Sequence, residues 1–266
     1  MLRALRTLPR VSSAGLAQRS RSMAVAVGTR VEHCKRVLER ADAVCFDVDS
    51  TVVTSEGIDD LAAYLGVGEK VAALTAAAME GGMPFHEALA KRLEAMPMTK
   101  TQLDDMMETH PLTLTHGVKE LIATLHRREQ HVYFVSGGFR QMIHPIAKQC
   151  NVPTTHIYAN TLVFNEDGTL KGHLDSEPTS RAGGKAKVVA DLKALHGYIN
   201  VVMVGDGATD MEARDIPGGA DAFLGFGGIA VREKVKAGAD WFVTDFQDVI
   251  DVLNKVGVAG SWHEAP

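Results

Sequence analysis

Residues 43–51 read Ala43-Val-Cys-Phe-Asp-Val-Asp-Ser-Thr51, a short apolar run followed by two aspartates. The run at 43–46 predicts a buried strand, because short continuous apolar segments are typical of strands that are covered on both faces. Asp47 and Asp49 then stand at the carboxyl end of this strand, the edge where open α/β sheets bind ligands. Acidic turns are common, so the Asp-x-Asp pair by itself leaves a functional and a purely structural interpretation open.

The same apolar character returns five times farther along the chain. Strands are expected at 131–136, 156–159, 200–205, 221–226 and 241–244, and helices at 31–41, 118–128, 139–149, 185–195, 211–216, 230–237 and 246–256. Apolar strands that alternate with helices predict an α/β fold with a doubly wound, mostly parallel sheet of the Rossmann-like kind. Asp167-Gly168 is a strong turn signal, so a β-hairpin is expected within 162–172.

One segment interrupts this alternation. Residues 58–112 show helical patterns at 59–64, 71–79, 85–95 and 101–109 without a convincing strand, and they hold six of the eleven methionines. Methionine fills irregular apolar gaps, so these side chains fit either an ordinary helical core or a face that meets a substrate. An insert directly after the first strand lies over the ligand-binding edge. We therefore expect a helical cap at 58–112 and an α/β catalytic core formed by 31–57 and 113–256.

The two ends of the chain differ from this core. Residues 1–30 are rich in arginine and serine, contain no acidic residue, and place Leu2, Leu5 and Leu8 at a helical spacing. This composition is typical of an organellar transit peptide, for a plastid or a mitochondrion, although a basic tail without a targeting role has the same composition. Without such targeting, the protein is expected in the cytoplasm. Residues 257–266 are interpreted as a tail outside the fold.

Charge and hydropathy argue against several classes of protein. Six of the 28 basic residues lie within residues 1–31, so 22 remain in the rest of the chain against 33 acidic residues. An acidic body of this kind is not expected to bind nucleic acid. No run of about 18 apolar residues exists, so no membrane span is expected. Cys34, Cys45 and Cys150 form no Cys-x-x-Cys pair, which fits a reducing compartment.

A second acidic motif, Gly-Asp-Gly-Ala-Thr-Asp at 205–210, follows another expected strand. Asp206 and Asp210 are expected near a helix start, one turn apart, at the same edge of the sheet as Asp47 and Asp49. Three or four clustered carboxylates are costly unless a positive charge neutralises them. Because oxygen ligands favour a hard cation, the natural candidate is Mg²⁺.

Two further motifs supply groups that bind anions. Ser-Gly-Gly at 136–138 ends an expected strand just before a helix, where exposed backbone amides attract an anion. Gly-Gly-Lys at 183–185 places an ammonium group at another expected helix start. Taken alone, the first motif also fits a simple strand-to-helix turn, and the lysine fits a solvated surface residue. Together the four motifs supply a carboxylate nucleophile, a metal clamp, an anion cradle and a cation, which phosphoryl transfer requires.

In this order, the four motifs resemble those of the haloacid dehalogenase superfamily, and the match is closer still to its phosphoserine phosphatase family. The resemblance extends from Ala41 to about Leu253 and includes Glu56-Gly-Ile-Asp59 and Gly81-Gly-Met-Pro-Phe85. It implies a Mg²⁺-dependent phosphatase that converts O-phospho-L-serine to L-serine and phosphate through an aspartyl-phosphate intermediate. This reaction is the last step of serine biosynthesis.

The resemblance also implies a division of labour among the acidic residues. Asp47 is expected to attack phosphorus and to carry the phosphoryl group. Asp49 is expected to protonate the leaving serine oxygen and then to activate the hydrolytic water. The implied Mg²⁺ ligands are Asp47, the backbone carbonyl of Asp49, Asp206 and, directly or through water, Asp210.

Substrate contacts follow from the same resemblance. The implied substrate-binding residues are Glu56, Met79, Phe85, Arg92, Ser136, Gly137, Lys185 and Thr209. Glu56 is expected to bind the substrate ammonium and Arg92 its carboxylate, as a bidentate pair, although Arg92 alone also fits a solvated helix face. Met79 and Phe85 are expected to close the pocket. Glu80 departs from the family pattern, where a glycine is expected, and should point away from the phosphate.

Two rival functions and the assembly stay open at this point. The same mechanism suits another small phosphorylated metabolite, handled by a phosphomonoesterase or by a phosphotransferase with an acceptor such as homoserine. A doubly wound module that binds a phosphorylated ligand without turnover is the second rival, although it has no need of Asp47 and Asp49 together. The expected binding partner is a small-molecule substrate. The oligomeric state stays open, and a homodimer is one of the alternatives.

Overall fold

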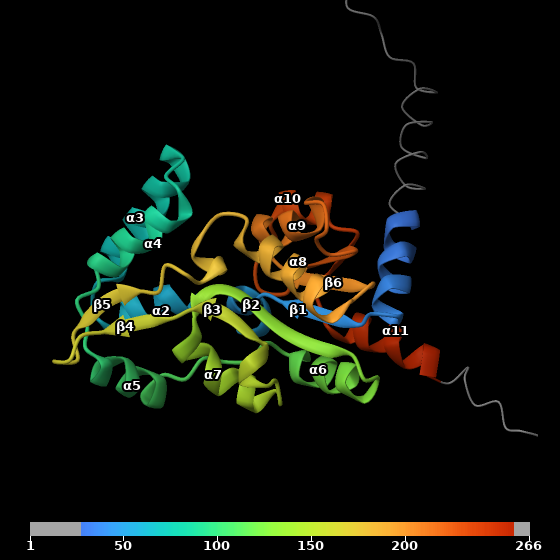
Figure 1. Ribbon diagram of the computed structural model, residues 1–266, viewed down its shortest axis with the longest axis horizontal. Coiled ribbons are helices and arrows are strands. Elements are labelled where there is room, and N and C mark those ends of the chain that lie inside the picture. The colour runs from blue at the N-terminus through green and yellow to red at the C-terminus, as the bar shows by residue number, and fades with distance from the viewer. Residues whose placement is uncertain (1–27, 258–266) are drawn as a thin grey trace, which may run out of the picture.

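A six-stranded parallel sheet forms the centre of the chain in the computed structural model, which describes residues 28–257 apart from the side chains of 79–81 and 256–257 (Figure 1). The strand order is β3-β2-β1-β6-β7-β8. The strands are β1 (Ala43–Phe46), β2 (His131–Phe139), β3 (Ile157–Asn160), β6 (Val201–Gly205), β7 (Ala222–Phe226) and β8 (Trp241–Val243). The predicted α/β doubly wound, mostly parallel sheet is confirmed.

The order of the strands reverses between β1 and β6. The chain runs outward from β1 through β2 to β3, and later returns to the other side of β1 as β6, β7 and β8. Open α/β sheets bind ligands at such a switch point, beyond the carboxyl ends of the strands. Asp47 comes directly after β1 and Asp206 directly after β6. The topology therefore brings both acidic motifs to one place.

Helices cover both faces of the sheet, and successive side chains of β1 pack alternately against the helices of one face and of the other. Val44 and Phe46 pack into the apolar cluster on one face, whereas Ala43 and Cys45 pack into the cluster on the other. The first layer contains the helix of residues 28–39, α6 (Val118–Arg127), α7 (Arg140–Gln149) and α11 (Gln247–Gly257). The second contains α8 (Gly184–His196), α9 (Ala208–Asp215) and α10 (Glu233–Gly238). Because both faces are covered, β1 is buried along its whole length.

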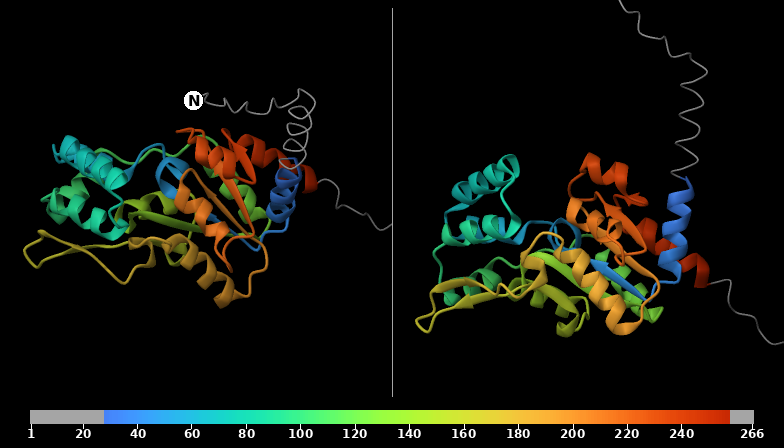
Figure 2. Two further views of the ribbon diagram at one scale, coloured as in Figure 1. Left: turned by 90° about the horizontal axis from the view of Figure 1, so that it is seen from above. Right: turned by 45° about the horizontal axis from the view of Figure 1, so that its top comes forward.

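Four helices and a hairpin pack together at one end of the sheet. They are α2 (Gly57–Tyr64), α3 (Gly68–Gly81), α4 (Phe85–Glu94), α5 (Lys100–Thr109) and the antiparallel strands β4 (Leu162–Phe164) and β5 (Leu170–His173). Leu61, Leu89 and Leu103 of the helices share one buried apolar cluster with Leu162 of the hairpin. Figures 1 and 2 place this unit at the end of the molecule opposite to the helix of residues 28–39. Three short helical turns complete the part of the chain that the structure describes: η1 (Val48–Val52), η2 (Thr154–His156) and η3 (Pro178–Ser180).

Several element ends differ from the sequence prediction, and one of the differences affects the site. The sequence predicts a helix at 211–216, but α9 begins at Ala208. The Asp210 carboxylate explains the earlier start, because it accepts a hydrogen bond of 2.9 Å from the Gly207 amide and so caps the first turn. Thr209 and Asp210 therefore lie inside the helix, in its first turn.

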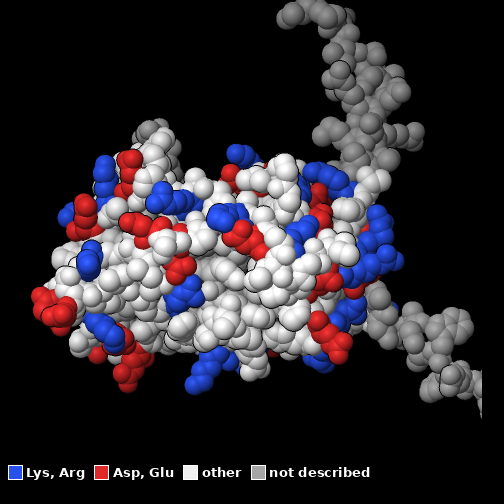
Figure 3. Space-filling view, in the orientation of Figure 1, with Lys and Arg blue, Asp and Glu red and all other residues white. Residues whose placement is uncertain are grey.

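On the face drawn in Figure 3, basic and acidic side chains are interspersed, and uncharged surface separates them. Within residues 28–257, no helix has the length and the apolar character that a bilayer crossing requires. The predicted transit peptide at 1–30 and the predicted tail at 257–266 fall almost entirely outside the described residues.

Candidate active site

The chain bends sharply after β1, and the bend directs Asp47 and Asp49 into one cavity. Asp47 is extended, with φ −65° and ψ 158°, and its Oδ1 accepts a hydrogen bond of 2.7 Å from the Val48 amide. The turn η1 is irregular, since Asp49 is extended inside it and Ser50 is left-handed at φ 53°. A left-handed serine is uncommon and costs about 1–3 kcal/mol, so the surrounding structure must hold this bend in place.

The cavity has a volume of about 350 Å³ and lies beyond the carboxyl ends of β1, β2 and β6. Its core walls include Asp47, Asp49, Gly137, Gly138, Thr179, Gly184, Lys185, Asp206 and Thr209. The helical insert contributes Ile58, Phe85, Leu89 and Arg92. Carboxylates and a lysine thus face apolar side chains and an arginine across the same space, as in a site that binds a small polar ligand.

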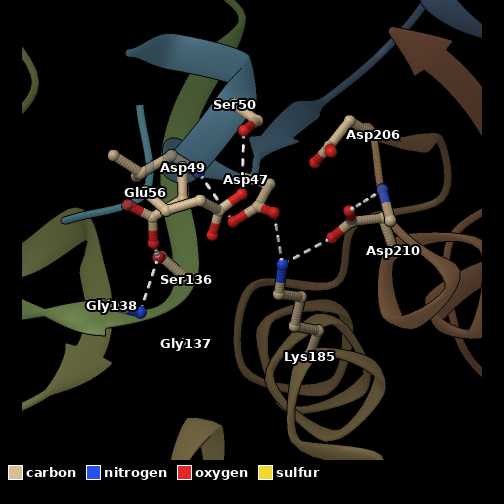
Figure 4. Close-up of polar contacts among 12 residues, drawn as sticks. Asp47, Asp49, Ser50, Glu56, Ser136, Gly137, Gly138, Lys185, Asp206 and Asp210 are labelled. Carbon is tan, nitrogen blue, oxygen red and sulfur yellow. Dashed lines mark hydrogen bonds and ion pairs between the residues drawn. The ribbon is translucent and has the colours of Figure 1, made fainter. Parts of the chain in front are cut away.

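Lys185 joins two carboxylates at the floor of the site (Figure 4). Its Nζ lies 2.7 Å from Asp47 Oδ2 and 2.7 Å from Asp210 Oδ1, and the residue is only 9% exposed. Burial lowers the pKa of this ammonium, but Asp210 and Asp47 together outweigh burial, so its pKa is raised. Lys185 is therefore a permanent positive charge in the cavity.

Three buried aspartates form a cluster that could hold a cation. Carboxylate oxygens of Asp47, Asp206 and Asp210 lie within 4.8 Å of one another, and all three residues are buried. Burial raises the pKa of Asp206 and also that of Asp210, because the charged carboxylates have lost most of their hydration. An oxygen-only donor set with excess negative charge fits a small hard cation such as Mg²⁺.

Asp49 is poised to hold a proton. Its Oδ1 accepts a hydrogen bond of 2.8 Å from the Gly57 amide, and its Oδ2 lies 3.5 Å from Ser136 Oγ. Burial, followed by the neighbouring carboxylates of Asp47 and Glu56, raises the pKa of Asp49 to about 7. Asp47 and Asp49 are therefore neighbours in chemically different environments, as expected for a nucleophile and a proton donor.

Two glycines at the end of β2, Gly137 and Gly138, form another part of the cavity wall. The Gly138 amide donates a hydrogen bond of 2.9 Å to Ser136 Oγ. A Cβ atom at Gly138 would lie 2.7 Å from Asp49 Oδ2, and one at Gly137 would lie 3.2 Å from Phe85 Cζ. The close approach of neighbouring side chains thus explains why glycine follows Ser136 twice.

The predicted specificity residues lie on several elements. Glu56, just before α2, accepts a hydrogen bond of 2.8 Å from Ser50 Oγ. Arg92 and Phe85 reach the cavity from α4, and Thr209 reaches it from the first turn of α9. Met79 is the other residue that is predicted to close the pocket. Its side chain and that of Glu80 lie outside the described part of the chain.

Arg232 belongs to the site, although no sequence motif singles it out. Its Nε donates a hydrogen bond of 2.8 Å to Asp206 Oδ2, and its guanidinium lies 3.7 Å from Glu56 Oε1. Arg181 and Glu212 also line the cavity. The available signal for Arg232 is its place after the glycine pair that follows β7, since β7 neighbours β6 and ends at the same edge of the sheet.

The comparisons with known proteins agree on one family. The model of the haloacid dehalogenase-like hydrolases matches residues 41–214. The chain is 46% identical to the chloroplastic phosphoserine phosphatase of Arabidopsis thaliana over 213 residues, which cover 80% of this chain and 72% of that protein. It is 44% identical to the phosphoserine phosphatase of Bos taurus over 215 residues, which cover 81% of this chain and 94% of that protein.

Solved structures have a similar fold. A phospho-aspartyl intermediate analogue of phosphoserine phosphatase matches with a TM-score of 0.67 at 28% identity, covering 79% of this chain and 97% of that one. DsGPDH of Dunaliella salina matches with a TM-score of 0.72 at 35% identity over 82% of this chain, and the chain spans 37% of that longer protein.

Proposed function

The chain belongs to the haloacid dehalogenase-like hydrolase family, and we propose that it hydrolyses O-phospho-L-serine to L-serine and phosphate. The observation that carries this proposal is the meeting of Asp47, Asp49 and Lys185 in one cavity at the switch point of the sheet. The phosphoserine phosphatase relatives align over 80% and 81% of the chain, which supports a shared substrate.

Asp47 is the proposed nucleophile. The Val48 amide holds its Oδ1 and Lys185 holds its Oδ2, so the carboxylate has a fixed orientation at the cavity wall. Attack by a carboxylate oxygen forms a bond to phosphorus and breaks the bond between phosphorus and the serine oxygen, which leaves an aspartyl-phosphate. Attack of water on this intermediate then releases phosphate and regenerates the carboxylate.

Asp49 is proposed to move the proton in both half-reactions. With a pKa of about 7, its carboxyl group is partly protonated near neutral pH and can protonate the leaving serine oxygen. As a carboxylate, it can next remove a proton from the attacking water. Ser136, Gly137 and Lys185 are proposed to bind the phosphoryl oxygens, because two of them line the cavity and Ser136 lies beside Asp49.

The aspartate cluster is proposed to hold Mg²⁺ through Asp47, Asp206 and Asp210, with the backbone carbonyl of Asp49. When bound, the cation supplies positive charge that offsets the negative charge of the phosphoryl group. Arg232 already compensates Asp206 in part, since the two side chains form an ion pair of 2.8 Å.

Phosphate release from phosphoserine, phosphothreonine and a sugar phosphate tests the proposed function directly. We expect turnover of phosphoserine in Mg²⁺, loss of activity on addition of excess EDTA, and full recovery when Mg²⁺ is restored, because the aspartate cluster lacks its counter-charge without the cation. Turnover of another phosphomonoester in preference to phosphoserine would assign a different substrate. Activity that EDTA leaves unchanged would contradict the metal assignment.

Arg92 and Glu56 are proposed to select the substrate by binding its carboxylate and ammonium. Arg92→Ala should raise the KM for phosphoserine by more than about tenfold, because a bidentate charged pair is lost. Steady-state kinetics on phosphoserine measure this change. Lys91→Ala is the matched control, since Lys91 is the exposed neighbour on the same helix and does not line the cavity. An unchanged KM in Arg92→Ala would remove Arg92 from the substrate site.

Two proposals concern the organisation of the chain. Residues 58–112 are proposed to act as a cap over the catalytic core, because α4 brings Phe85, Leu89 and Arg92 to the cavity. Residues 1–30 are proposed to direct the protein to an organelle, which their composition and the chloroplastic relative support. Imaging of a fluorescent protein fused behind residues 1–30 tests the targeting.

A further inference from the structure

Asn160 is a buried amide that connects two loops of the site without lining the cavity. It ends β3, and none of its surface is exposed. Its Nδ2 donates a hydrogen bond of 2.8 Å to the Gly137 carbonyl, and its Oδ1 accepts one of 3.1 Å from Thr179 Oγ1. The orientation of the amide is unambiguous, because the Gly137 carbonyl oxygen can only accept.

The contact with Gly137 continues to Ser136 through a single peptide unit. The carbonyl that Asn160 binds belongs to the peptide whose N–H is that of Gly138, and this N–H donates 2.9 Å to Ser136 Oγ (Figure 4). The Ser136 oxygen therefore accepts from the backbone, and its hydroxyl donates a hydrogen bond of 3.5 Å to Asp49 Oδ2, which lines the cavity. Each donor in this series points toward the site, so each bond polarises the next.

The contact with Thr179 reaches the loop that leads to Lys185. Thr179 is buried in η3, and it lines the cavity. A Cβ atom at Gly184 would collide with the Pro178 carbonyl oxygen and lie 2.9 Å from the Thr179 Cα, so η3 packs directly against the start of α8. Asn160 therefore ties the loop of Ser136 to the helix start that carries Lys185.

We propose that Asn160 is a positioning residue that aims the Ser136 hydroxyl at the phosphoryl group through the Gly137–Gly138 peptide. The proposal rests on the proposed phosphatase function and assigns a role to a residue that does not touch the substrate. Without the Asn160 donor, the peptide can rotate, the Gly138 N–H leaves Ser136, and the hydroxyl loses its fixed direction. The affinity of the site for the phosphate group is therefore expected to fall.

Three near-isosteric variants test this role, with inorganic phosphate in Mg²⁺ as the probe. Asn160→Leu removes both hydrogen bonds, and Thr179→Val removes one. Gln130→Met is the matched control, because Gln130 is another buried amide, which donates to the Leu38 and Ala41 carbonyls at 2.7 Å and 3.0 Å and does not line the cavity. The readouts are the inhibition constant of phosphate, kcat and KM for phosphoserine, and the thermal unfolding midpoint.

We expect the inhibition constant of phosphate to rise about tenfold or more in Asn160→Leu and about threefold in Thr179→Val. In Gln130→Met it should stay within about twofold of wild type while the unfolding midpoint falls, since only stability is affected there. Inhibition constants within twofold of wild type in both Asn160→Leu and Thr179→Val would overturn the proposal. If Asn160→Leu does not fold, Thr179→Val decides alone.

A double-mutant cycle separates positioning from packing. In a Ser136→Ala background, Asn160→Leu should change phosphate binding by less than about threefold, because the group that it positions is already absent. Full additivity of the two effects would show that Asn160 does not act through Ser136. Phosphate binding is also measurable as a phosphate-induced rise in the unfolding midpoint. The role of Asn160 in phosphate binding can therefore be tested even if the wild-type protein does not hydrolyse phosphoserine. Lack of phosphoserine hydrolysis would contradict the proposed function and would leave the role of Asn160 in phosphate binding to be decided by these measurements.

Discussion

Replacement of Asp47 by asparagine should abolish phosphoserine hydrolysis, with a fall in kcat of about 10⁴-fold or more, because an amide cannot form the acyl-phosphate bond. The protein should stay folded, since Lys185 keeps its 2.7 Å contact with Asp210. Acid quenching of a reaction with ³²P-labelled phosphoserine should trap label on the wild-type chain and none on Asp47→Asn.

Asp191→Asn serves as the control for this variant. Asp191 is an exposed carboxylate that pairs with Lys187 on the surface of α8, so its loss should leave kcat within about twofold of wild type. Labelled protein or near-normal turnover in Asp47→Asn would mean that another group carries the phosphoryl intermediate.

Replacement of Lys185 by methionine should damage both activity and stability. The variant leaves Asp47 and Asp210 buried without their shared cation, and the loss of one partner from a buried ion pair costs about 3–5 kcal/mol. Activity should fall about 10²–10³-fold, because a positive charge aimed at the phosphoryl oxygens disappears. Urea unfolding and steady-state kinetics measure the two effects.

Magnesium should restore part of the stability lost in Lys185→Met, because a cation that binds only the folded protein stabilises it by mass action. Lys187→Met is the matched control on the same helix, since Lys187 is exposed and pairs with the exposed Asp191 on the surface. If the two variants had equal stability, the ion pairs of Lys185 would contribute nothing measurable to folding.

The family and the fold class could be predicted from sequence because their signals are local. The predicted haloacid dehalogenase relationship is confirmed by the family model over residues 41–214, and the predicted parallel sheet is confirmed by the strand order. A buried parallel strand can be predicted from a continuous apolar run. The residue that follows the run then lies at the carboxyl edge of the sheet. Strand ends and helix starts locate all four motifs, at 47–49, 136–138, 183–185 and 205–210.

Other features of the site depend on partners that no local pattern reveals. Arg232 pairs with Asp206 across 26 residues of sequence, and Asn160 binds the Gly137 carbonyl across 23. In the sequence, Asn160 is a polar residue that follows an apolar run, and this pattern gives no sign of a role in the site. Its role becomes visible in the structure, where Asn160 is fully buried between two loops. The early start of α9 also escapes prediction, because it follows from one side-chain cap on Gly207.

The sequence by itself determined the chemical groups and the edge of the sheet at which they gather. Residue type and strand periodicity are properties of short segments, so they suffice to predict a phosphoryl-transfer site that contains Asp47, Asp49 and Lys185. The tertiary structure alone decided how these groups share charge and protons. It placed Lys185 between Asp47 and Asp210, and it buried the Asp49 carboxyl near the carboxylates of Asp47 and Glu56, so that the pKa of Asp49 is raised. Pairing and desolvation depend on distances between side chains far apart along the chain, and only folding sets those distances.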